Sequence, residues 1–220
     1  MTGAAHDLVL FDLDGTLSDP MEGFVRSMNY ALTHFGYEPV ETKDLATYVG
    51  PPIDEAFRNI TGKDAASEIN ALIAKYRERY NEVGYSENVL YRGVAEALDG
   101  LSAANIPMAV CTSKRQDFAE KVLALFGLRQ HFRFVSGGDV GIHKWQQMES
   151  LRLEKKVSGS SIMVGDRAVD MIAAHRNGLK AAGVLWGYGS HAELTGEAPL
   201  HLFESPGELQ RLADGWERPG

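Results

Sequence analysis

The sequence predicts an α/β fold in which a parallel sheet forms the core and an all-helical segment is inserted near its start. Short apolar strand segments alternate with amphipathic helical segments from residue 8 onward, which is typical of βαβ units and a parallel sheet. The interval after residue 18 breaks this alternation, because it has helical apolar spacing and no convincing strand. We therefore expect a core of residues 1–18 and 88–220 and a helical cap domain of residues 19–87.

The first predicted strand is the apolar run of residues 8–11, and it ends on two carboxylates, Asp12 and Asp14. Side chains at i and i+2 of an extended segment point the same way. Two acids at one strand end are costly to crowd together without a cation or a proton between them. Gly15 then lets the chain turn away, because glycine tolerates a positive φ. The pattern suits a divalent-metal site with a carboxylate free to attack phosphorus, although a simple Asp-Gly turn is the alternative.

Three helices are expected within the inserted segment. Apolar residues follow helical spacing over residues 24–35 and again over residues 69–83. Between these stripes, Gly50-Pro51-Pro52 predicts a turn before a short helix around residues 55–60. Because this block lies between the first and second strands of the sheet, we expect it to form a separate cap over the site.

The remaining elements continue the alternation of strands and helices. Strands are expected over residues 106–111, 132–138, 161–164 and 181–185, and helices over about 94–101, 118–126, 144–155, 168–177 and 206–213.

Polar side chains follow three of these later strands. Thr112 and Ser113 come directly after the second strand, Lys144 follows the third after a short loop, and Asp166 and Asp170 follow the fourth. In open parallel sheets, ligands bind outside the carboxyl ends of the strands. These groups are therefore in the right places to form one site with the acid pair of the first strand.

On these four segments, which span Phe11 to Asp170, the sequence resembles the haloacid dehalogenase superfamily of phosphohydrolases. It is most similar to the phosphoglycolate phosphatase and 5'-nucleotidase-like branch, which has a small helical cap. The resemblance continues through residues 183–189. It implies a Rossmann-like core and a Mg²⁺-dependent phosphomonoesterase that hydrolyses a small phosphorylated metabolite through an aspartyl-phosphate.

The resemblance assigns the two catalytic carboxylates. Asp12 is expected to be the nucleophile, because a carboxylate can attack a phosphoryl centre and split the hydrolysis into two easier steps. Asp14 suits general acid duty on the leaving alkoxide and then base duty on the attacking water. Dehalogenases of this superfamily usually lack the second aspartate, so its presence favours phosphoryl chemistry.

The expected metal ligands are the carboxylates of Asp12 and Asp166 and the backbone carbonyl of Asp14, since Mg²⁺ prefers oxygen ligands. Asp170 lies one helical turn beyond Asp166 and is expected to support this metal site from behind the ligands. The simpler alternative is that Asp166 and Asp170 only place favourable charge at a helix N-terminus.

The expected phosphate-binding groups are the Thr112 hydroxyl, the Ser113 backbone N–H and the Lys144 cation. Thr112 could instead be the N-cap of the next helix, and Lys114 is a rival for the role of Lys144. Lys144 is followed by Trp145 where the family commonly has proline, which leaves its placement open. The segment 186–189 could touch the cap or the substrate, or be a plain surface loop.

Composition limits the partners. A formal net charge of −8 argues against binding a nucleic acid polymer, because phosphate backbones are bound by basic surfaces. The single cysteine, Cys111, rules out an intrachain disulfide. No signal peptide and no transmembrane segment are expected, so we predict a cytoplasmic protein without a membrane partner.

Three alternatives to a phosphatase stay open at this point. A receiver-type phosphoacceptor module is disfavoured by the chain length and the helical insertion. A phosphomutase or a non-catalytic binding protein on the same fold would carry similar motifs. The sequence favours a nucleotide slightly over phosphoglycolate as substrate, because aromatic residues are available in the cap, and it does not determine the oligomeric state.

Overall fold

The computed structural model describes residues 6–213. Its centre is a six-stranded sheet with the strand order β5-β4-β1-β6-β7-β8, and every neighbouring pair is parallel. This arrangement confirms the predicted α/β fold. The strands are β1 (Val9–Phe11), β4 (Met108–Arg115), β5 (Phe132–Gly138), β6 (Ile162–Gly165), β7 (Lys180–Val184) and β8 (His201–Phe203).

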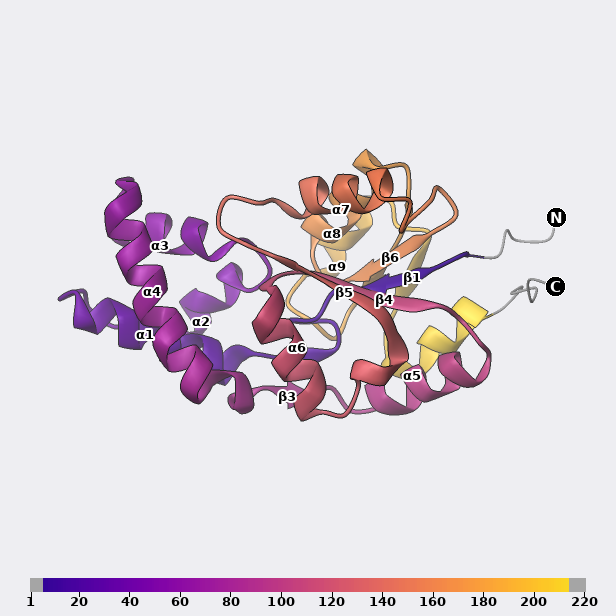
Figure 1. Cartoon of the computed structure of the whole chain (residues 1–220), viewed down its shortest axis with the longest axis horizontal. Coiled ribbons are helices and arrows are strands. Elements are labelled where there is room, and N and C mark those ends of the chain that lie inside the picture. Colours follow the sequence, from indigo (N-terminus) through magenta and orange to yellow (C-terminus); the bar gives the residue numbers. More distant parts are fainter. Residues whose placement is uncertain (1–5, 214–220) are drawn as a thin grey trace.

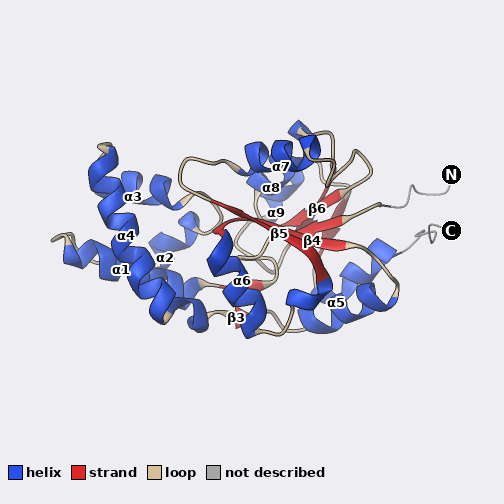
Figure 2. Cartoon of the chain, viewed as in Figure 1, coloured by secondary structure: helices blue, strands red, loops and turns tan. Residues whose placement is uncertain are grey.

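Helices cover both faces of this sheet (Figures 1 and 2). One face packs against α5 (Val94–Ala103), α6 (Gln116–Leu125) and the 3₁₀ helix η4 (Pro206–Ala213). The other face packs against α7 (Lys144–Leu153), α8 (Ala168–Arg176) and α9 (His191–Gly196). A further 3₁₀ turn, η3 (Arg129–His131), leads into β5.

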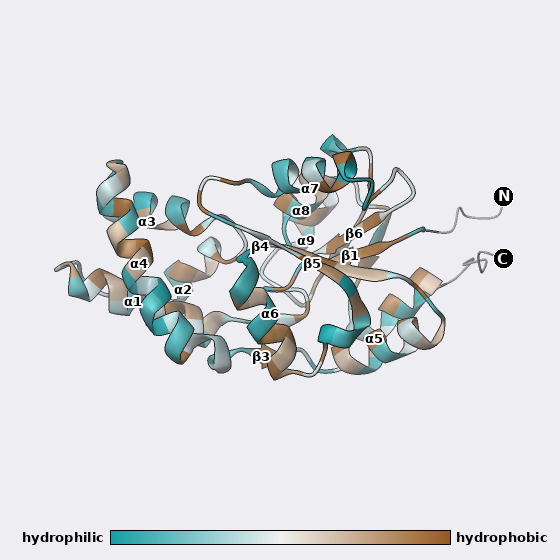
Figure 3. Cartoon of the chain, viewed as in Figure 1, coloured by the Kyte–Doolittle hydropathy of each residue, from teal (hydrophilic) through white to brown (hydrophobic). Residues whose placement is uncertain are grey.

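Strand β1 shows why the sheet needs both layers of helices. Val9 and Phe11 face the first hydrophobic layer, whereas Leu8 and Leu10 face the second, because successive side chains of a strand point to opposite faces. All three residues of β1 are fully buried. The central strands are accordingly apolar along their length, as the brown colour of β1 and β6 in Figure 3 shows.

The inserted segment (residues 19–87) lies between β1 and β4 and forms its own helical layer beyond one end of the sheet (Figure 1). It contains α1 (Met21–His34), α2 (Thr42–Leu45), η1 (Ala46–Tyr48), α3 (Ile53–Thr61), α4 (Ala66–Glu82) and η2 (Gly84–Glu87). The three predicted helices are α1, α3 and α4, whereas the short α2 and η1 were not predicted. A separate hydrophobic cluster, which includes Phe24, Leu32, Phe57 and Tyr76, holds the segment together.

A two-stranded antiparallel ribbon joins the inserted segment to the core. It pairs β2 (Ser18–Asp19) with β3 (Val89–Leu90). Asp19, which was expected to lie in an all-helical cap, is therefore a strand residue. The division of the chain at residues 18 and 88 remains a prediction, and it also includes residues 1–5 and 214–220, which lie outside the described part.

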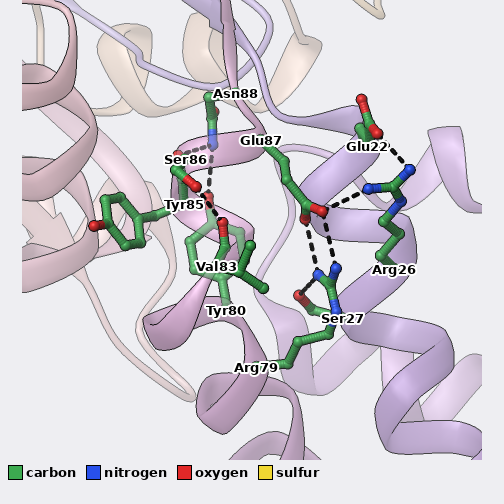
Figure 4. A network of polar contacts seen from close by, with 10 residues as sticks. All are labelled: Glu22, Arg26, Ser27, Arg79, Tyr80, Val83, Tyr85, Ser86, Glu87 and Asn88. Atoms are coloured by element: carbon green, nitrogen blue, oxygen red, sulfur yellow. Dashed lines mark hydrogen bonds and ion pairs between the residues drawn. The ribbon is translucent and has the colours of Figure 1, made fainter.

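Hydrogen bonds of Glu87 and Asn88 hold the chain in place where the inserted segment ends and the core begins again (Figure 4). The Glu87 carboxylate accepts hydrogen bonds from Arg79 at 2.8 and 2.9 Å and from Arg26 at 2.7 Å. These hydrogen bonds, led by that of Arg79, hold the pKa of Glu87 below its usual value. The Asn88 amide donates to the Tyr80 hydroxyl at 3.1 Å and to the Tyr85 carbonyl at 3.0 Å. Two helices of the inserted segment, α1 and α4, are thereby connected to the chain just before β3.

Several predicted boundaries were wrong. The sheet has a sixth strand, β8, and the helix α9 precedes it, and neither was predicted. The helix expected over residues 206–213 is a 3₁₀ helix. The helix expected over 144–155 ends at Leu153, shortly before Lys155 adopts a left-handed conformation with a φ of 57°.

No helix within residues 6–213 combines the length and the apolar character needed to cross a membrane. The N-terminal prediction, that no signal peptide is present, rests largely on residues 1–5 and lies outside the described residues.

Candidate active site

The predicted site residues meet at the carboxyl edge of the sheet. Asp12 directly follows β1, Asp166 directly follows β6, and Thr112 and Ser113 lie in the second half of β4. Strand β1 lies between β4 and β6, so these side chains converge from neighbouring strands. Lys144 joins them as the first residue of α7.

Lys144 lies between two carboxylates. Its Nζ is 3.0 Å from Asp12 Oδ1, and it also donates a hydrogen bond to Asp170 Oδ1. Burial alone would lower the pKa of Lys144, but Asp12 and Asp170 raise it above its usual range. The lysine is therefore a fully buried, charged group. Trp145, which stands where the family commonly has proline, is the second residue of α7, and Lys144 reaches Asp12 with Trp145 in that position.

Three buried carboxylates form a cluster that suits a cation. Asp12, Asp166 and Asp170 each offer a carboxylate oxygen, and these oxygens lie within 4.8 Å of one another. Burial raises the pKa of Asp166 well above its usual value, and the neighbouring Asp170 and Asp12 raise it further. A divalent cation among these oxygens would relieve their repulsion. Oxygen-only donors of this kind fit Mg²⁺.

Asp170 has a different position in the cluster from the other two acids. Its Oδ1 accepts from Lys144, and its Oδ2 accepts the backbone N–H of Arg167 at 3.1 Å. Burial raises the pKa of Asp170 to about 6, although the Lys144 charge acts in the opposite direction. Because both oxygens accept hydrogen bonds from the protein, the geometry favours a supporting role for this residue.

Asp14 lies beside a second lysine. Lys114 Nζ is 2.8 Å from Asp14 Oδ2, and it donates to the Tyr80 hydroxyl, also at 2.8 Å. Burial raises the pKa of Asp14, and Lys114 offsets part of that shift. Lys114, the rival for the role of Lys144, thus contacts the expected acid, whereas Lys144 contacts the expected nucleophile.

Thr112 and Ser113 line the site without forming a helix cap. Thr112 is 1% exposed, and its hydroxyl accepts the backbone N–H of Lys114 at 3.3 Å. The N-cap of α6 is Arg115, so the alternative that Thr112 caps this helix is wrong. The Ser113 hydroxyl is buried and has no hydrogen-bond partner among residues 6–213.

The loop of residues 186–189 holds Asp166, which sequence reasoning did not predict. The Tyr188 backbone N–H donates to Asp166 Oδ2 at 2.8 Å, and the Thr16 hydroxyl donates to Asp166 Oδ1 at 3.2 Å. A Cβ on Gly187 would lie 2.4 Å from Asp166 Cβ and 2.3 Å from the Gly15 carbonyl oxygen. The close approach requires glycine, so the glycines flanking Tyr188 were the available sequence signal.

A cavity of about 80 Å³ lies between this edge of the sheet and the inserted segment. Asp12, Asp14 and Thr112 line it from the core. Most of its other lining side chains are apolar or aromatic, including Phe24, Tyr48, Val49, Pro52, Tyr76 and Phe118. The pocket thus has the charged residues Asp12 and Asp14 on its core side and a largely apolar wall elsewhere.

The chain matches the family model described as haloacid dehalogenase-like hydrolase over residues 9–184. It is 34% identical over 210 residues to a 5'-nucleotidase of Pseudomonas aeruginosa, covering 94% of this chain and 95% of that protein. It is 34% identical over 189 residues to a phosphoglycolate phosphatase of Agrobacterium fabrum, covering 82% of this chain and 81% of that protein.

Two further similarities extend this picture. The chain is 37% identical over 192 residues to the tyrosine-protein kinase PtkA of Mycobacterium tuberculosis, covering 85% of this chain but 65% of the longer kinase. The crystal structure of a predicted phosphatase from Clostridium acetobutylicum superposes with a TM-score of 0.88 at 30% identity, covering 94% of this chain and 97% of that one. The chain therefore belongs to the haloacid dehalogenase-like hydrolase family.

Proposed function

We propose that this hydrolase is a Mg²⁺-dependent phosphomonoesterase that acts on a small phosphorylated metabolite through an aspartyl-phosphate on Asp12. The observation that carries the proposal is the position of Asp12. Its carboxylate lies 3.0 Å from the buried Lys144 cation and within 4.8 Å of the oxygens of Asp166 and Asp170. A carboxylate held next to a cation and a metal-binding cluster can approach an anionic phosphate, which an isolated carboxylate would repel.

The first half of the reaction transfers the phosphoryl group to the enzyme. A carboxylate oxygen of Asp12 forms a bond to phosphorus while the bond from phosphorus to the ester oxygen breaks. Asp14 gives its proton to the departing oxygen. Burial raises the pKa of Asp14, which favours the protonated form that this step requires.

The second half releases phosphate and restores the enzyme. Asp14, now ionised, takes a proton from a water molecule as the water oxygen attacks phosphorus. The bond between phosphorus and Asp12 breaks, and inorganic phosphate leaves. Lys114, 2.8 Å from Asp14 Oδ2, is placed to stabilise the ionised form of Asp14 in this step.

The phosphate-binding groups proposed are the Thr112 hydroxyl, the Ser113 backbone N–H and the Lys144 cation. Mg²⁺, held by the Asp12 and Asp166 carboxylates and the Asp14 backbone carbonyl, would supply positive charge that offsets the charge of the transferred group. Asp170 would keep Lys144 charged and correctly oriented through their hydrogen bond.

We propose a nucleoside 5'-monophosphate rather than phosphoglycolate as the preferred substrate. The apolar and aromatic wall of the pocket suits a nucleobase, whereas the leaving group of phosphoglycolate offers this wall only a methylene group and one carboxylate. The name of the Pseudomonas aeruginosa relative, a 5'-nucleotidase, supports this choice. We propose that residues 19–87 act as a cap that closes over this substrate, and the protein is proposed to work in the cytoplasm.

Turnover of p-nitrophenyl phosphate with and without Mg²⁺ tests the proposed activity. Metal-dependent release of p-nitrophenolate is expected from the purified chain. Absence of turnover with any member of a panel of phosphorylated metabolites would support a non-catalytic binding protein instead. Transfer of phosphate to a second hydroxyl of the substrate, without release of inorganic phosphate, would identify a phosphomutase.

A further inference from the structure

We propose that Arg167 is a positioning residue that fixes the pocket wall formed by residues 48–53 and thereby controls the affinity for substrates whose leaving group reaches this wall. The proposal rests on the proposed phosphomonoesterase function. Arg167 lies between Asp166 and the start of α8, so it belongs to the core loop that carries Asp166 of the carboxylate cluster. Its side chain reaches from that loop to the inserted segment.

The guanidinium of Arg167 binds the backbone of the wall directly. Its Nη1 donates to the Val49 carbonyl at 2.8 Å and lies 3.4 Å from the Thr47 carbonyl as a second acceptor. A Cβ on Gly50 would lie 3.2 Å from Arg167 Cγ, so the wall and the arginine stem are also in close contact. Hydrogen bonds from a charged donor are about twice as strong as those between neutral groups.

A second contact, to Glu193 in the core, orients the guanidinium of Arg167. Arg167 Nε donates to Glu193 Oε1 at 2.9 Å, and the same oxygen accepts the backbone N–H of Ala168, also at 2.9 Å. The Arg167 side chain is only 19% exposed, so this ion pair is shielded from much of the solvent. Arg167 is therefore held on one side by the core and on the other by the wall.

The wall that Arg167 holds is part of the substrate pocket. Residues 48–53 line the cavity, and Asp12 and Asp14 line it from the core. Among the residues that the structure describes, the other polar contacts from the core to the inserted segment reach residues outside 47–53, as in the pairs Arg77–Asp139, Lys114–Tyr80 and Tyr188–Asp19. The position of the wall relative to the site thus depends on Arg167.

The side chain of Arg167 can be changed without removing its support of the cluster. Asp170 Oδ2 accepts the backbone N–H of Arg167 at 3.1 Å, and any residue except proline retains that donor. The effect of a side-chain substitution should therefore appear in substrate affinity and leave the Mg²⁺ requirement unchanged.

The test compares Arg167→Met, which keeps the length of the stem but has no donors, with Arg167→Lys, which keeps the charge. Arg176→Met is the matched control, because Arg176 is the last residue of α8, is exposed and contacts the Trp145 ring. The substrates are adenosine 5'-monophosphate, whose leaving group reaches the wall, and acetyl phosphate, whose leaving group is too small to do so.

For Arg167→Met we expect KM for the nucleotide to rise about tenfold, because two charge-assisted hydrogen bonds to the wall are lost. The kcat for the nucleotide and the KM for acetyl phosphate should each stay within about threefold of the wild type, since the reacting groups are untouched. Arg167→Lys should restore part of the nucleotide affinity, and Arg176→Met should behave as the wild type. An equal KM rise for both substrates, or a fall in kcat alone, would overturn the proposal.

Hydrogen exchange of the unliganded protein provides a readout that does not need activity. Peptides covering residues 42–53 should exchange about tenfold faster in Arg167→Met than in the wild type, because the wall loses its anchor to the core. Arg176→Met should leave that segment unchanged. Unchanged exchange in Arg167→Met would show that the arginine does not hold the wall. Absence of turnover in the wild type would contradict the proposed function, and the exchange measurement would still decide the role of Arg167.

Discussion

The carboxylates of Asp12 and Asp14 both follow the end of β1, but their surroundings differ. Asp12 lies 3.0 Å from the buried Lys144 cation, which suits a nucleophile that has to meet an anionic phosphate. Asp14 lies beside Lys114, and burial raises its pKa, which suits a group that gives and takes a proton. The contacts of each side chain thus support the proposed roles, nucleophile for Asp12 and acid and base for Asp14.

Asp12→Asn should lower kcat at least about a thousandfold, because an amide cannot form the acyl phosphate. The fold should remain, since Lys144 keeps its contact with Asp170. Initial rates with p-nitrophenyl phosphate measure the effect, and circular dichroism checks the fold. Asp99→Asn is the control, because Asp99 is an exposed acid on α5. Rates near the wild type in a preparation free of wild-type enzyme would contradict the role of Asp12.

Activity should vanish with EDTA and return with Mg²⁺, because the crowded carboxylates of Asp12 and Asp166 repel phosphate when no cation lies between them. Asp166→Ala should be inactive or require at least about tenfold more Mg²⁺ for half-maximal rate. A titration of rate against Mg²⁺ concentration measures both effects. If the Asp166→Ala variant showed the wild-type midpoint, the metal would bind elsewhere.

Gly187→Ala should disturb the same site through packing. The added methyl group would lie 2.4 Å from Asp166 Cβ and 2.3 Å from the Gly15 carbonyl, so the loop must move, at a cost of about 1–3 kcal/mol. We expect a lower Tm and a higher Mg²⁺ requirement. Gly207→Ala is the matched control, since no atom outside its own turn lies within 4 Å of the added carbon. Equal behaviour of the two variants would show that the loop does not hold Asp166.

At the scale of elements, the sequence predicted those strands and helices that bury a long apolar run. The strands β1 and β6 lie within such runs, and β4 begins with one. The strand β8 was missed because it has three residues and its first two are only half-buried. The two-residue strands β2 and β3 exist only because each pairs with the other, and such short strands depend on tertiary context.

In the candidate site, too, some residues could be predicted from the sequence and others could not. The residues at strand ends, such as Asp12 and Asp166, could be located because parallel strands bring their carboxyl ends to one edge. The supporting contacts could not, because they join distant segments. Thr16 and Asp166 are 150 residues apart, and Arg167 and Val49 are 118 residues apart. A single sequence carries no signal for such pairs of ordinary residues.

The ribbon between core and inserted segment should respond to pH through Glu87. Arg79 lowers the pKa of Glu87 below its ordinary value of 4.5 by hydrogen bonding. A depressed carboxyl pKa contributes stability that is complete above the unfolded value and is lost as the pH falls through the folded one. Glu87→Gln should therefore lower Tm at pH 7, and the difference from the wild type should shrink below about pH 4.

Thermal unfolding at several pH values measures this difference. Glu22→Gln is the control, because within residues 6–213 Glu22 forms an ion pair with the exposed Arg26 alone, whereas Glu87 forms ion pairs with both Arg26 and Arg79. A Tm difference for Glu87→Gln that stays constant from pH 7 to pH 3 would show that the ionised carboxylate does not fix the ribbon.

At the scale of the whole molecule, contacts between the inserted segment and the core surround the pocket. Arg77 on α4 binds Asp139 at 2.8 Å, and Tyr80 on the same helix accepts from Lys114. Arg167 holds the opposite wall through the Val49 carbonyl. The pocket is thus bounded by the inserted segment on more than one side, which limits the size of what can reach Asp12.

A confined pocket with an apolar wall predicts the class of substrate. Small phosphomonoesters should be hydrolysed, and phosphopeptides should not, because the inserted segment bounds the pocket on more than one side and a peptide chain is bulkier than a single metabolite. Among small substrates, a nucleobase that buries about 60 Å² of apolar surface against the wall gains about 1.5 kcal/mol, which is about tenfold in affinity. We therefore expect kcat/KM for a nucleoside 5'-monophosphate to exceed that for phosphoglycolate about tenfold, as measured in a metabolite panel. Higher kcat/KM for phosphoglycolate would contradict the role given to the wall, and efficient hydrolysis of phosphopeptides would contradict the closed pocket itself.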